Sequence, residues 1–143
     1  MLGAVIIFAL FSVIERVAPG YRLPKEPWWI LRGVFWFAAS VAVGHFSAEF
    51  LHHFLSPYTL LDLHFLGLWA VLPALFVYEL LTYGFHRALH GVPLLWRAHQ
   101  LHHSSERLDV WSTWRVHPFE QIGYTLASVL ISIGLLGTSA QTA

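Results

Sequence analysis

Four long apolar runs dominate this sequence and restrict what it can fold into. They cover residues 1–17, 28–48, 60–85 and 119–137, and each approaches the about 20 apolar residues that a membrane-spanning helix needs. Apolar residues make up 57% of the chain and charged residues only 11%, against about 25% charged residues in an average soluble domain. The sequence therefore predicts an all-α, multi-pass membrane bundle with four apolar segments, forming a single membrane domain over residues 1–143.

The remaining composition narrows the classes of function. A formal net charge of zero argues against a nucleic-acid partner. The absence of cysteine excludes disulfides, thiolate zinc sites and iron–sulfur clusters, and it leaves histidine and carboxylate as the strong metal ligands. The first apolar run lacks the basic start and small-residue cleavage site of a signal peptide, so we interpret it as a membrane helix.

Charges in the connections between the apolar runs predict the orientation of the bundle. The first connection carries Arg16, Arg22 and Lys25, and the third, residues 87–118, carries four arginines, whereas the second has neither lysine nor arginine. The positive-inside rule therefore places the first and third connections in the cytoplasm. The third connection is long and rich in leucine and tryptophan, so we expect short helices that lie at the membrane surface.

Five of the ten histidines lie within the eighteen residues 86–103. His86 and His90 are four residues apart, and a second cluster repeats helical spacing at His99, His102 and His103. Residues three or four apart on a helix share one face, with about 5–6 Å between their Cβ atoms. Neutral imidazole is the commonest metal ligand in proteins, and five imidazoles exceed the need of one tetrahedral ion. The pattern predicts a two-metal centre on the cytoplasmic side, with these five histidines as ligands.

Glu79 and Tyr83 lie on the same helical stripe as the first histidine pair. An ionisable group at membrane depth is costly and usually functional, so Glu79 is a candidate to orient an imidazole or to bind metal itself. The structural alternatives are that Glu79 pairs with Arg87 or Arg32 and that Tyr83 anchors the helix at the interface. Both interpretations of each residue stay open.

His117 belongs to a compact polar group that precedes the fourth apolar run. Pro118 suits the first turn of a helix, and Glu120 is favourably close to the positive end of that helix. His117 either supports the metal ligands or caps the helix at the interface. A further polar set shares helical spacing but is expected across the membrane from the metal centre, as a polar helix end: His45, Glu49, His52 and His53.

A family resemblance adds to this interpretation. From Glu79 to Glu120 the chain reads ELLTYGFHRALHGVPLLWRAHQLHHSSERLDVWSTWRVHPFE. Its histidine boxes, Leu-Trp pair and Arg-x-His-Pro-x-Glu motif resemble, in order, those of the fatty acid hydroxylase superfamily, also called the sterol desaturase family, with a motif core at residues 76–120. Glu79 stands where the family usually has aspartate.

The resemblance implies hydroxylation or desaturation of a fatty acyl or sterol-like lipid by a non-haem di-iron centre, with O₂ and a separate electron-donor protein. It implies iron-ligand roles for His86, His90, His99, His102 and His103. The family has a further histidine box towards its C-terminus that this chain does not contain. We therefore expect an incomplete domain, whose ligand set a later segment or a homo-oligomer would complete.

A different class of function is a non-catalytic membrane protein whose histidines bind metal or a b-type haem. Haem ligation needs only two facing histidines, which would leave three of the five without a role.

Overall fold

The structure is a computed structural model that describes residues 2–20, 22–55, 61, 63–134 and 136. In chain order its elements are α1 (Leu2–Val17), α2 (Trp29–Leu55), the 3-10 helix η1 (His64–Ala70), α3 (Val71–Gly91), α4 (Pro93–His103), the 3-10 turn η2 (Ser112–Trp114) and α5 (Pro118–Gly134). These described residues contain helices and connections but no strand, which confirms the all-α prediction. The outer limits expected for the third and fourth apolar segments, residues 60 and 137, lie outside the described residues.

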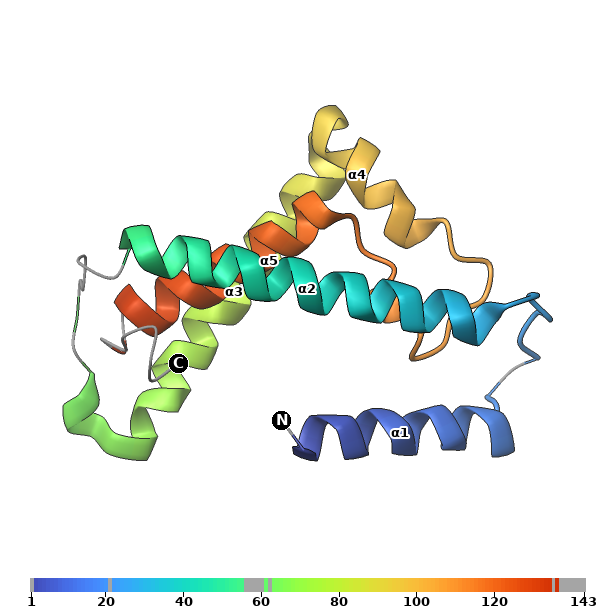
Figure 1. The fold of residues 1–143 in the computed structure, drawn as a ribbon. Coiled ribbons are helices and arrows are strands. Elements are labelled where there is room, and N and C mark those ends of the chain that lie inside the picture. Colours follow the sequence, from blue (N-terminus) through green and yellow to red (C-terminus); the bar gives the residue numbers. More distant parts are fainter. Residues whose placement is uncertain (1, 21, 56–60, 62, 135, 137–143) are drawn as a thin grey trace.

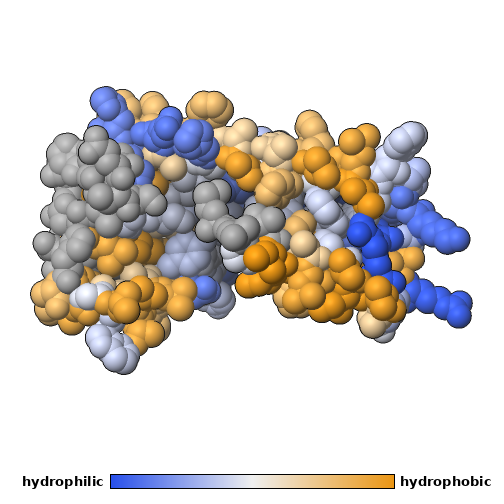
Figure 2. Space-filling view, turned by 60° about the horizontal axis from the view of Figure 1, so that its bottom comes forward, coloured by the Kyte–Doolittle hydropathy of each residue, from blue (hydrophilic) through white to orange (hydrophobic). Residues whose placement is uncertain are grey.

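Two stretches are long and apolar enough to cross a membrane. They are Trp29–Leu55 and Phe65–Gly91, and only 6% and 11% of their most apolar windows are buried inside the protein. Such low burial separates them from the core helices of a soluble protein, because their apolar side chains face outwards. Figure 2 shows broad hydrophobic surfaces of this kind. The helices α1 and α5 have 16 and 17 residues, so four membrane spans stay a prediction.

Prolines and one glycine set the helix boundaries. Pro93 and Pro118 each begin a helix, at the first-turn positions where a missing backbone N–H costs nothing. The third apolar run is not one continuous α-helix as expected. Gly67 has a φ of 55° inside η1 and turns the chain before α3 begins at Val71, a conformation that glycine adopts without steric cost.

Helices α2, α3 and α5 form the main packed unit (Figure 1). α5 lies along α2, where Gly44 faces Gln121, and it crosses α3 at Gly123. A Cβ atom at Gly123 would collide with the ring of Phe85, so the two helices approach one another too closely for any other residue. This crossing brings the C-terminal half of α3 against the first half of α5.

The connection between α4 and α5 holds the other end of the bundle together. Its Asp109 accepts hydrogen bonds from Trp29 Nε1 at 2.7 Å and from Arg107 Nε at 2.8 Å. Arg107 also donates to the carbonyl of Pro24, and the N–H of Val110 donates to Glu15 on α1. The first and third connections therefore lie together at one end, as the charge pattern predicts for two connections on one side of a membrane.

A labelling experiment tests this arrangement in the membrane. The chain has no cysteine, so single-cysteine variants can be labelled without background. We expect Arg22→Cys and Glu106→Cys to react with an impermeant maleimide from the same side of sealed vesicles. His53→Cys, at the other end of α2, should react only from the opposite side. Labelling of His53→Cys and Glu106→Cys from one side would contradict the predicted topology.

Candidate metal centre

The α3–α4 hairpin brings the two histidine clusters together. α3 continues through His86 and His90 to Gly91, Val92 takes an extended conformation (φ −102°, ψ 116°), and Pro93 starts α4. The chain therefore reverses within one residue, and α4 packs back against α3 (Figure 1). The short helix expected in the third connection is therefore present as α4, and it returns the second histidine cluster to the first. Its position at the membrane surface stays a prediction.

Four histidine nitrogens converge on one point. The Nε2 atom of His90 lies 3.2 Å from the Nε2 atoms of three other histidines. Two of these, on His99 and His103, are 3.1 Å apart. The complete group is His86, His90, His99 and His103, and its ligand atoms all lie within 4.8 Å of one another.

Hydrogen bonding among the imidazoles does not account for this convergence. A neutral imidazole nitrogen carries either one proton or one lone pair, so it makes one good hydrogen bond. Nε2 of His90 has three nitrogen neighbours at 3.2 Å. A central cation, in contrast, accepts all four lone pairs at once.

The spacing fits the coordination shell of a single transition-metal ion. Metal–nitrogen bonds of about 2.0–2.1 Å in a tetrahedron place neighbouring nitrogens about 3.3 Å apart. Four of the six nitrogen–nitrogen separations are 3.1 or 3.2 Å, and all four ligand atoms lie within 4.8 Å of one another. The described residues therefore supply one preformed four-nitrogen site, composed of two histidines from α3 and two from α4.

Two residues of α5 contact the outer ring nitrogen, Nδ1, of two of these histidines. Nδ1 of His99 lies 3.0 Å from Oε1 of Glu120, and both side chains are almost completely buried. Nδ1 of His86 lies 3.2 Å from the hydroxyl of Tyr124. A proton held on Nδ1 by the carboxylate leaves the Nε2 lone pair free for metal, as in many metal sites.

Electrostatics keep the buried ligand neutral. Burial lowers the pKa of His99 below its ordinary value of 6.5, and the neighbouring His103 and His90 lower that pKa further. His99 therefore takes up a proton only at a pH below the ordinary pKa of a histidine side chain. At pH 7 its lone pair is available to a metal ion.

His102 lies beside the four-histidine group without joining it. Its ring centroid is 5.6 Å from that of His99 and 5.5 Å from that of His103. Adjacent residues on a helix point about 100° apart, so His102 and His103 cannot both face the same ion. A ligand role for His102 stays a prediction.

The three residues proposed from the sequence to support the metal ligands lie outside the four-histidine group. Glu79 is exposed and lies outside the group, and Tyr83 is exposed and accepts a hydrogen bond from Arg87 at 3.2 Å. His117 caps α5: its Nδ1 accepts the N–H of Phe119, and its carbonyl accepts two further N–H groups. The helix-cap contacts of His117 are therefore present, and a role in supporting the metal ligands stays a prediction.

Glu120 and Tyr124 are functional candidates that sequence reasoning missed. The sequence contains a pattern that could have identified them. Glu120 belongs to the Arg-x-His-Pro-x-Glu motif, and Tyr124 follows it by one helical turn. The polar residues on α2 that share helical spacing lie outside the four-histidine group. Among them, Nε2 of His45 lies 3.5 Å from Oε1 of Glu49.

Comparison with known proteins gives one match. A family model described as fatty acid hydroxylase matches residues 71–143, which begin at α3 and include all four converging histidines. No curated protein and no solved structure matches the chain.

Metal titration tests the site directly. We expect the purified protein to bind one transition-metal ion at the four-histidine group, and His90→Ala to abolish tight binding because His90 touches all three other ligands. His45→Ala removes an exposed histidine elsewhere and should leave the affinity unchanged. Unchanged stoichiometry and affinity in His90→Ala would contradict the site.

A second titration separates the two candidate carboxylates. Glu120→Gln should weaken metal binding about 10- to 100-fold, the loss typical when a group that orients a metal-bound histidine is removed. Glu79→Gln makes the same chemical change on α3 and should have no effect on affinity. Equal losses in both variants would show that Glu120 has no special role.

Proposed function

The chain belongs to the fatty acid hydroxylase family, and on this basis we propose that it is a membrane-bound, iron-dependent oxidoreductase that hydroxylates or desaturates a lipid with O₂. The observation that carries the proposal is the convergence of four Nε2 atoms within the matched region. When bound, iron supplies the redox chemistry that activates O₂ for attack on an unactivated C–H bond.

The protein's own residues have distinct tasks in this proposal. The four Nε2 atoms hold the ion, while Glu120 keeps the proton of His99 on Nδ1 and Tyr124 fixes the ring of His86. The apolar surfaces of α3 and α5 guide a fatty acyl or sterol-like chain towards the site. They also exclude water from the reacting carbon.

We assign His102 to a second iron ion. Its ring is already next to those of His99 and His103, so a small rearrangement of α4 could include it in a shared site. The further ligands that a second ion needs would come from outside the described residues or from a second copy of the chain. Electrons would come from a separate redox protein at the cytoplasmic side, where the positive-inside rule places the histidines.

The haem-binding alternative conflicts with the arrangement of the histidines. Axial haem ligands lie on opposite sides of a flat macrocycle, whereas Nε2 atoms only 3.1–3.2 Å apart leave no space for one. Storage or buffering of a metal ion is compatible with the same four nitrogens. An activity measurement is therefore required to distinguish catalysis from metal binding.

The proposed test compares lipid products in membranes that contain the iron-loaded protein. With ¹⁸O₂ and a reduced ferredoxin as electron source, hydroxylation adds one labelled oxygen to a lipid, whereas desaturation removes two hydrogens and adds no label. We expect one of these products from a full-length or oligomeric form in which the ligand set is complete, and none from His99→Ala in the same form. The matched control His45→Ala should retain the activity.

Each result has a defined meaning. Product that depends on O₂ and on His99 supports the oxidoreductase. An iron-loaded protein that forms no oxidised lipid would favour metal buffering, and oxidised lipid that forms equally with His99→Ala would contradict the proposal.

A further inference from the structure

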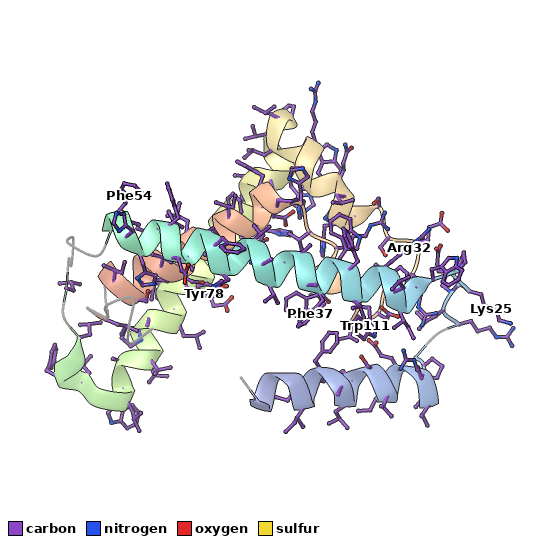
Figure 3. The ribbon with its side chains drawn as sticks, viewed as in Figure 1. Lys25, Arg32, Phe37, Phe54, Tyr78 and Trp111 are labelled. Carbon is purple, nitrogen blue, oxygen red and sulfur yellow. The ribbon has the colours of Figure 1, made fainter. Side chains whose placement is uncertain are left out.

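A pocket lies at the end of the bundle where the first and third connections meet. It has a volume of about 230 Å³ and is lined by Trp29, Arg32, Gly33, Trp36, Trp111, Ser112 and Arg115. Figure 3 shows Arg32 and Trp111 near one another along α2, with Phe54 at the opposite end of that helix. The ring of Trp111 packs directly on Gly33, where an added Cβ would lie 2.6 Å from the ring.

Two of the residues that line the pocket carry hydrogen-bond donors without acceptors. Nε of Arg115 and Nε1 of Trp111 are buried without a hydrogen-bond partner. The other contact of the Arg115 guanidinium is a long one, 3.5 Å from the carbonyl of Ser104. Buried donors are normally paired, and a guanidinium pairs best with an oxyanion.

The neighbouring carboxylates are already engaged. Asp109 accepts hydrogen bonds from the side chains of Trp29 and Arg107 and from two backbone N–H groups. Glu26 pairs with Arg32 on the protein surface, at 3.2 Å. No acidic residue is among the described residues that line the pocket, so the positive charge of Arg115 has no internal counter-charge there.

From these observations we propose that this pocket binds the oxyanion of an amphiphilic lipid, a phosphate or a carboxylate. Its volume is below the about 300 Å³ at which pockets for drug-sized ligands begin, so it suits a headgroup and not a whole lipid. Three tryptophans line it at the helix end, the depth at which indole rings favour the membrane interface. The proposal concerns binding and does not depend on the proposed oxidation.

The experiment measures binding to the protein in a neutral detergent, by calorimetry and tryptophan fluorescence. The probes are dioctanoyl phosphatidic acid, octanoate, inorganic phosphate, and dioctanoylglycerol, which has the same chains as the first probe but no phosphate. We expect phosphatidic acid to bind more tightly than dioctanoylglycerol. Arg115→Gln and Arg32→Gln should each weaken that binding about tenfold or more, the loss that follows removal of a charged hydrogen bond.

The matched control is Arg97→Gln, which removes an exposed arginine of α4 outside the pocket and should leave binding unchanged. One-to-one metal binding at the four histidines verifies that each variant is folded. Arg32 is exposed, so Arg32→Gln tests the site even if Arg115→Gln does not fold.

The probes also identify the source of the oxyanion. Tighter arginine-dependent binding of phosphatidic acid or octanoate than of inorganic phosphate supports a lipid ligand. Equal arginine-dependent binding of inorganic phosphate would overturn the lipid assignment in favour of a free anion. Equal affinities of Arg32→Gln and Arg97→Gln for phosphatidic acid would overturn the site.

Discussion

The buried contact between His99 and Glu120 is the interaction on which the four-histidine group depends. It joins α4 to α5, and it keeps a fully buried imidazole paired with a carboxylate. A buried polar group without its partner costs about 1–3 kcal/mol, so the pairing favours the docked position of α4. With α4 docked, His99 and His103 face the two histidines of α3, and four nitrogens converge without further adjustment.

A second set of contacts aligns the rest of the bundle with that site. Asp109 connects the start of α2 to the long third connection, and Phe8 of α1 packs against Trp111 and Trp114 of the same connection. The segment between α4 and α5 therefore contacts both N-terminal helices, α1 and α2. Its arginines and tryptophans combine this structural role with a surface suited to the membrane interface.

Local patterns in the sequence predicted local structure well. The helical spacing of His86 and His90 predicted their shared face, and Pro118 marked the start of a helix, because these signals depend only on neighbours along the chain. Contacts between helices were not predictable in the same way. Glu79 shares the stripe of the first histidine pair, yet Glu120 is the carboxylate that reaches a histidine, because tertiary packing decides which side chains meet across helices.

The crossing of α3 and α5 at Gly123 has a mechanical consequence. The end of the Phe85 ring lies against the backbone of Gly123 there, so the size of this side chain contributes to the distance between the helices. Phe85 is followed directly by His86, and Gly123 directly by Tyr124, whose hydroxyl contacts that histidine. The position of His86, a candidate metal ligand, therefore depends on the size of the neighbouring phenyl ring, and a substitution of Phe85 would move this histidine without replacing it.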